Sequence, residues 1–99
     1  VKSLHNKIFL KRKLYTLRMA ESSSVTDHIN NLNTLFAQLT ALGYKIVDTE
    51  RAEILLHSLP DSYDQLIINL TNNILTDMLS FIDVAAAVLE EESRRKNKE

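Results

Sequence analysis

The stretch SVTDHINNLNTLFAQLTALG, residues 24–43, carries the clearest helical pattern in the chain. Ser24 can accept a hydrogen bond from a backbone N–H of the first turn, and Asp27 follows three residues later, as in a capping box. Gly43 is placed to end the helix in the left-handed conformation. Apolar residues recur between them at helical spacing, at Val25, Ile29, Leu32, Leu35, Phe36, Leu39 and Leu42. We therefore predict an amphipathic helix whose apolar face lies in the core.

The next helix is predicted to run from Asp48 to Leu59. Asp48 can cap its first turn, and Pro60 ends it because proline lacks the N–H that a helix interior needs. The predicted inner face consists of Ala52, Leu55, Leu56 and Leu59. Ile54 lies away from that face, beside Arg51 and Ser58. An outward isoleucine is either an interface anchor or an ordinary exposed apolar side chain.

Two further capping boxes predict the last two helices. Ser62 with Gln65 would open the fourth helix, on which Ile68 is a second outward apolar residue. Ser80 with Asp83 would open the fifth helix. The residues predicted to point inward from this last helix are Phe81, Val84, Ala85, Val88 and Leu89. From Ser93 onward we expect a fraying helix or linker, so the predicted division is a helical domain at 1–93 and a basic tail at 94–99.

The first segment, roughly Leu4 to Met19, has helix-forming composition but two apolar sides. Leu10, Leu14 and Leu17 fall on one side. The nearly opposite side carries Leu4, Ile8, Tyr15 and Met19. A surface helix needs only one apolar face. We therefore expect this helix to lie between its own domain and a second subunit or a neighbouring domain.

Composition agrees with a small helical protein. The 99 residues suffice for one domain, and they include 44% hydrophobic and 25% charged residues. A single Gly and a single Pro favour helices joined by short polar loops, since hairpin turns usually need glycine. The predicted fold is all-α, a compact bundle of about five helices. Because the first residue is Val1 and not Met, we expect a piece of a longer protein.

The net charge of −1 hides two basic ends. The candidate nucleic-acid contacts are Lys11, Arg12 and Lys13 in the first segment and Arg94, Arg95 and Lys96 near the end. Such clusters can bind RNA or an acidic partner, or they can be solvated helix faces.

Nothing in the sequence predicts catalysis. There is no cysteine, no phosphate-binding glycine loop and no nucleophile motif. The three histidines are far apart in sequence, and we expect His28 to face water. No apolar run approaches the roughly 20 residues of a membrane span. We expect no cofactor, metal, small-molecule substrate or membrane partner.

Several short segments together resemble a known family. They are LYTLRM (14–19), SVTDHIN (24–30), LNTL (32–35), LLHSLPDSY (55–63) and EEESRRK (90–96). In this combination and order, the chain resembles the Gag polyprotein of copia-type LTR retrotransposons over essentially its whole length. The helix that opens at Ser24 would correspond to the major homology region.

The resemblance implies a capsid domain similar to the C-terminal lobe of retroviral capsid proteins. It implies homodimers or homo-oligomers that build virus-like particles around the element's RNA in the cytoplasm, together with neighbouring Gag domains outside this chain. In such lobes the helix corresponding to Asp48–Leu59 often forms the dimer contact. The zinc knuckle that commonly follows in this family cannot lie here, because the chain has no cysteine.

Three hypotheses therefore stay open: capsid assembly, RNA binding through the basic ends, and a domesticated Gag that binds host proteins. The candidate self-association residues are Leu10, Leu14, Leu17, Arg51, Ile54, Ser58 and Ile68.

Overall fold

The fold is all-α, as predicted. The computed structural model describes residues 2–72 and 79–98, with side chains from Leu4 onward. Within these ranges there are five α-helices, one 3₁₀ turn and no strand. The helices are α1 (Lys2–Thr16), α2 (Val25–Ala41), α3 (Asp48–His57), α4 (Asp64–Asn72) and α5 (Phe81–Asn97), and the 3₁₀ turn η1 is Asp61–Tyr63.

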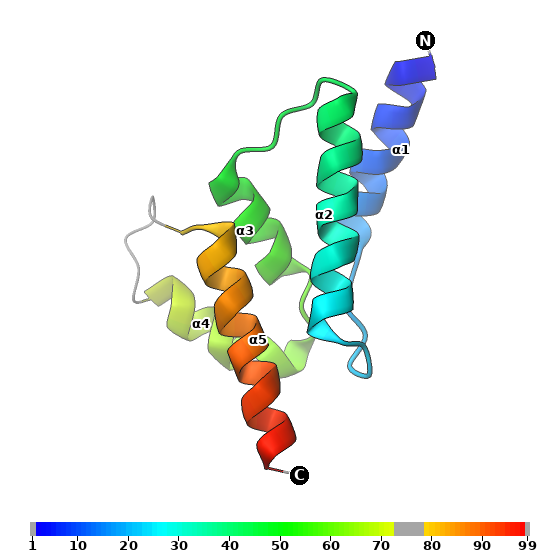
Figure 1. The fold of residues 1–99 in the computed structure, drawn as a ribbon. Helices are drawn as coiled ribbons and strands as arrows, with labels where there is room; N and C mark the ends of the chain where they lie inside the picture. The colour runs from blue at the N-terminus through cyan, green and yellow to red at the C-terminus, as the bar shows by residue number, and fades with distance from the viewer. Residues whose placement is uncertain (1, 73–78, 99) are drawn as a thin grey trace.

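The helices form a bundle around α2, α3 and α5. α5 packs against α3 and α2, α1 packs against α2, and α4 follows η1 and lies beside α5, partly behind it in this view (Figure 1). The N-terminus of α1 and the C-terminus of α5 lie at opposite ends of the molecule (Figure 1).

The core is built on the apolar face of α2. Phe36 is 1% exposed, and its ring meets the edge of Phe81 from α5 at a centroid distance of 5.6 Å and an angle of 83°. This edge-to-face arrangement stabilises the core in addition to the contribution from burying two large side chains. The other largest side chains that are essentially fully buried are Leu14, Leu32, Leu39, Leu55, Val25, Val84, Val88 and Ser58. They come from α1, α2, α3 and α5 and from the end of α3, so one core joins these helices.

The signals at both ends of α2 are confirmed. The Ser24 side chain accepts a hydrogen bond from the Asp27 N–H at 3.3 Å. Gly43 follows the helix with φ +88°, the left-handed conformation that favours glycine. The Ser80 box of α5 is also confirmed, since its hydroxyl accepts from the Asp83 N–H at 3.1 Å.

Two predicted caps are wrong. The residue before α3 is Val47, which has no capping side chain, and the Asp48 carboxylate instead accepts from the Phe81 N–H of α5 at 3.3 Å. Ser62 does not cap α4, because it lies in η1 and its hydroxyl donates to Glu21 Oε1 at 2.7 Å. In both cases a tertiary contact takes the side chain that local sequence assigned to its own helix.

α5 continues beyond the expected end of the domain. It runs to Asn97, so residues 94–97 are helical and not an extended linker. The Arg95 guanidinium lies 4.0 Å from the centre of the Tyr63 ring, a cation–π contact that fixes the end of α5 to η1. Glu91 receives hydrogen bonds from Arg94 at 2.6 Å and from Arg95 at 2.9 Å.

These arginines should make Glu91 unusually acidic. Their hydrogen bonds, Arg94 first and then Arg95, lower the pKa of Glu91 from 4.5 to about 2. Because the pKa in the folded state lies below the unfolded value, the pairs stabilise the fold above pH 4.5 and lose that contribution as the pH falls toward 2. We expect an NMR titration of the Glu91 carboxyl carbon to give a midpoint near 2.

Replacing both partners, as Arg94→Met with Arg95→Met, should raise that midpoint toward 4.5. Lys98→Met removes a cation from the same end of α5 and serves as the control. A midpoint near 4.5 in the wild-type protein would contradict the ion pairs.

Candidate self-association surface

One side of α1 is covered by the domain itself. Leu14 is 1% exposed, and Leu10 and Leu17 are half-buried against the same core. All three were expected at an interface between copies. The structure gives this side of α1 a partner within the chain, mainly α2, so Leu14 cannot touch another copy while α1 keeps this position.

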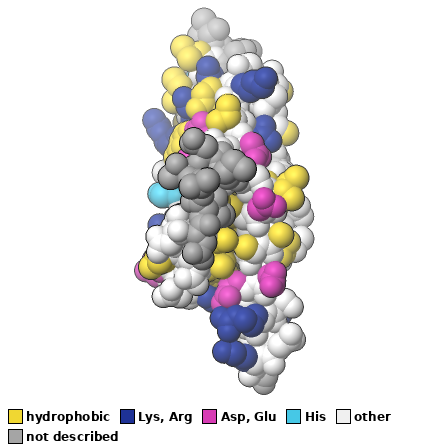
Figure 2. Space-filling model, turned by 90° about the vertical axis from the view of Figure 1, so that its left-hand side faces the viewer, with side chains coloured by type: hydrophobic (Ala, Val, Ile, Leu, Met, Phe, Trp, Pro, Cys, Tyr) yellow, Lys and Arg dark blue, Asp and Glu magenta, His cyan; other side chains and the backbone are white. Residues whose placement is uncertain are grey.

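The other side of α1 is uncovered. Leu4 is 62%, Ile8 49%, Phe9 52% and Tyr15 41% exposed. Figure 2 shows apolar and basic side chains next to one another at the upper end of the molecule, where α1 begins and α2 ends (Figure 1). The Tyr15 hydroxyl donates to Glu50 Oε2 at 2.5 Å, and this hydrogen bond raises the tyrosine pKa above its ordinary value. A run of exposed apolar residues on one helix face is typical of an interaction site.

The predicted outward position of Ile54 is wrong. Ile54 is 5% exposed and Ser58 is 1% exposed. α3 is packed on two sides, because α5 covers one and the segment after α1 reaches the other, where the Met19 N–H donates to the Ser58 carbonyl at 2.8 Å. Ile54 contributes to the lining of a shallow groove of about 540 Å³ that also includes Tyr15. Another molecule could therefore touch Ile54 only through this groove.

Arg51 is half-buried and engaged within the domain. Its Nε donates to the Ile46 carbonyl at 3.0 Å, and its guanidinium lies 5.1 Å from the Phe36 ring centre. Ile68, by contrast, is exposed on α4 as expected. No side chain of α4 is fully buried, although Leu66, Ile67 and Leu70 pack partly against the core.

His28 is buried and does not face water, so that prediction is wrong. His28 Nε2 lies 2.6 Å from the Ser58 hydroxyl oxygen, and that hydroxyl donates to the Leu55 carbonyl at 2.7 Å. Since the serine proton is used there, His28 Nε2 carries the hydrogen and donates it to Ser58. Burial lowers the pKa of His28. The sequence spacing could have indicated that His28 is buried. His28 lies three residues after Val25 and four before Leu32, so it falls on the same apolar face of the helix.

The candidate basic residues divide into two groups. Arg94 and Arg95 form ion pairs with Glu91, and Arg95 also donates to Ser62. The cations of α1 form no ion pair within the described residues: Lys13 is exposed, Lys11 lies 4.3 Å from the Tyr44 ring centre and Arg12 lies 6.0 Å from that of Phe9.

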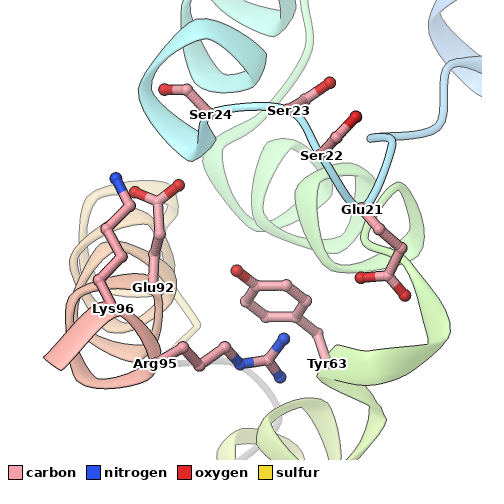
Figure 3. A pocket seen from close by; sticks show the side chains of 8 residues that line it. All are labelled: Glu21, Ser22, Ser23, Ser24, Tyr63, Glu92, Arg95 and Lys96. Atoms are coloured by element: carbon pink, nitrogen blue, oxygen red, sulfur yellow. The ribbon is translucent and has the colours of Figure 1, made fainter. Parts of the chain in front are cut away.

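Lys96 borders a polar pocket of about 400 Å³ between residues 21–24, which precede α2, and the elements η1 and α5 (Figure 3). In this view Arg95 reaches toward the Tyr63 ring, while the carboxylate of Glu92 points to the start of α2 (Figure 3). Glu92 Oε2 accepts a hydrogen bond from the Val25 N–H at 2.9 Å. The polar groups thus join α2 to α5, and no buried side-chain nitrogen or oxygen among the described residues lacks a partner.

The described part of the chain contains no group of three or more His, Cys, Asp or Glu residues able to hold a metal ion. Within residues 2–72 and 79–98, no helix combines the length and apolar character needed to cross a membrane.

Comparison with known proteins identifies the family. Residues 1–99 match the family described as gag-polypeptide of LTR copia-type. The chain is 42% identical over 98 residues to the retrovirus-related Pol polyprotein from transposon TNT 1-94 of Nicotiana tabacum. This alignment covers 99% of the chain and 7% of the tobacco polyprotein. No solved structure matches the chain. The copia-type segments in the sequence, the all-α fold and the match over the whole length agree, and the chain belongs to the gag polypeptides of copia-type LTR retrotransposons.

Proposed function

We propose that this chain is a self-assembly domain of a copia-type Gag protein. Copies would associate with one another and, with neighbouring Gag segments, build a particle around the element's RNA in the cytoplasm. The tobacco relative is named for Pol, whereas the family match over residues 1–99 is to gag. We therefore propose a structural role for this chain and no catalysis.

The uncovered side of α1 carries this proposal. Leu4, Ile8 and Phe9 expose about half or more of their surface although the opposite side of the same helix is packed. Fully burying an exposed side chain of this size is worth roughly 1.5–3 kcal/mol, and about half of that is still to be gained where half of the surface is already covered. A few of them give a weak pairwise contact, which becomes firm only when many copies assemble.

RNA binding by the α1 cations is the second candidate. Lys11, Arg12 and Lys13 lie on a helix whose residues 2–16 include no acid. Arg94 and Arg95 support it less, because both are paired with Glu91. RNA affinity that falls steeply with salt and is lost after neutralising Lys11, Arg12 and Lys13 would favour this function.

Dilution should reveal self-association. We expect light scattering of the 99-residue chain to show a mass that rises with concentration into the high micromolar range. Ile8→Lys should shift this transition to higher concentration, because it places a charge on the uncovered side of α1. The melting temperature should change little, since Ile8 is 49% exposed.

Ile68→Lys is the matched control, because Ile68 is also 49% exposed but lies on α4. A larger loss of association in Ile68→Lys than in Ile8→Lys would move the surface to α4. A wild-type chain that stays monomeric throughout the series would refute the proposed function for this domain.

A further inference from the structure

α5 has an uncovered face that the core does not use. Ile82 is 77% and Leu89 is 38% exposed, although Leu89 was expected to point inward. Ala86 and Ser93 are exposed as well. These four residues are spaced i, i+4, i+7 and i+11, so they form one line along the helix. We call this line the α5 seam. Leu89 lies next to the buried Val88, and the buried side chains of α5 among the described residues are Phe81, Val84 and Val88.

The uncovered side of α1 has the same spacing. Leu4, Ile8, Lys11 and Tyr15 also lie at i, i+4, i+7 and i+11. Leu4, Ile8 and Tyr15 are exposed, and Lys11 is half-buried. We call this line the α1 seam. Alternating steps of four and three residues are the pattern by which two helices pack side by side.

The two seams carry opposite charge. The α1 seam includes Lys11 and is bordered by Arg12, and residues 2–16 include no acid. An acid from another helix, Glu50 of α3, lies at the Tyr15 end of this seam, where it accepts the tyrosine hydrogen bond. The α5 seam is bordered by Asp83 and Glu90, and α5 carries no base before Arg94. Asp83 and Glu90 form no ion pair within the described part of the chain.

We infer that the α1 seam of one copy docks on the α5 seam of a second copy. The partner is a second copy of this chain, because the same chain carries both the basic α1 seam and the acidic α5 seam. This inference rests on the proposed function and adds to it the two surfaces that meet.

An antiparallel arrangement fits the side chains best. It sets Ile8 against Leu89, Tyr15 against Ile82, and Lys11 against the small Ala86. Lys11 and Arg12 then lie beside Asp83 and Glu90, and antiparallel helix dipoles attract. A parallel arrangement would instead place Lys11 on Leu89.

Such a contact is heterologous, since each copy offers α1 to one neighbour and α5 to another. Heterologous contacts produce rings when they close and filaments when they do not. The inference therefore predicts growth beyond dimers, which distinguishes it from a two-fold contact of α1 with α1.

Charge reversal tests the pairing. The first variant, Lys11→Glu with Arg12→Glu, makes the α1 seam acidic. The second variant, Asp83→Lys with Glu90→Lys, makes the α5 seam basic. In sedimentation velocity over a concentration series, each variant alone should associate about tenfold or more weakly than wild type, because like charges face each other.

Combining the variants should restore assembly. A chain with all four substitutions should associate within a few-fold of wild type, and so should an equimolar mixture of the two variants. Should Asp83→Lys disturb the start of α5, as judged by circular dichroism, the pair Lys11→Glu and Glu90→Lys gives the same comparison. Lys13→Glu with Lys45→Glu changes the net charge by the same amount and sign as the first variant, at exposed positions away from both seams, and it should assemble more nearly like wild type.

The outcomes separate the inference from the proposed function. A monomeric wild type would overturn both. Wild-type assembly with both variants behaving like the Lys13, Lys45 control would overturn the inference and leave self-assembly standing. Loss of assembly in only one of the two variants would also overturn it, since that result indicates a contact of one seam with itself.

Discussion

Phe36→Ala should lower the free energy of unfolding by about 3–5 kcal/mol. Phe36 is 1% exposed and its ring meets Phe81 edge to face, so truncation leaves a cavity and removes an aromatic contact between α2 and α5. Small domains are stable by only about 5–15 kcal/mol. The variant should therefore be close to unfolding at room temperature, and urea denaturation followed by circular dichroism would measure the loss.

Phe9→Ala is the matched control for this prediction. The substitution is chemically the same, but Phe9 is 52% exposed on α1. We expect a change within about 0.5 kcal/mol. Equal losses in the two variants would mean that the core is not organised around Phe36.

Breaking the buried His28–Ser58 hydrogen bond should have the second largest effect. Ser58→Ala leaves the His28 N–H without a partner in a site that is 4% exposed. An unsatisfied buried donor costs about 1–3 kcal/mol, so we expect a loss of that size at pH 7.5 in thermal or urea denaturation. Ser93→Ala, on the exposed seam of α5, should change stability little.

The same pair should make the domain sensitive to mild acid. Burial lowers the pKa of His28 below 6.5, its unfolded value. The unfolded chain therefore binds a proton more readily than the folded one, and stability falls as the pH drops below about 6.5. His28→Gln should reduce this slope, because its amide can still donate to Ser58 but does not titrate. Identical slopes in wild type and His28→Gln between pH 7.5 and 5.5 would contradict this account.

The sequence predicts those features of the fold that depend on neighbours along the chain. The apolar spacing of α2, the Ser24 and Ser80 caps, and Gly43 all act within a few residues, and each is found as predicted. Asp48 and Ser62 carry equally good local signals. Both fail because partners more than 30 residues away, Phe81 for Asp48 and Glu21 for Ser62, take their side chains.

The candidate surface is harder to predict from the sequence. The apolar spacing of a helix identifies an inner face only on the assumption that the helix is packed on one side. That assumption placed Ile54 and Ser58 outside, whereas α3 is covered on two sides and buries both. For α1 the sequence indicates two apolar sides, and two are present within Lys2–Thr16. Met19, which the prediction places on the second side, lies beyond the end of α1 and is buried in the core. Which of them the domain covers depends on how α1 lies on α2, and the sequence does not determine this. The prediction that Leu10, Leu14 and Leu17 meet a partner is therefore wrong, and the uncovered side is that of Leu4 and Ile8.

The hydrogen bond from Val25 to Glu92 has a consequence for synthesis on the ribosome. Chains emerge N-terminus first, and 67 residues separate the donor from its acceptor. The first turn of α2 therefore receives the hydrogen bond to Glu92 only after almost the whole domain has been translated. In the same way, Asp48 can accept its hydrogen bond only after Phe81 has been translated. A nascent chain that has exposed α1 still lacks α5, so a polysome carrying unfinished Gag chains presents the basic seam without the acidic one.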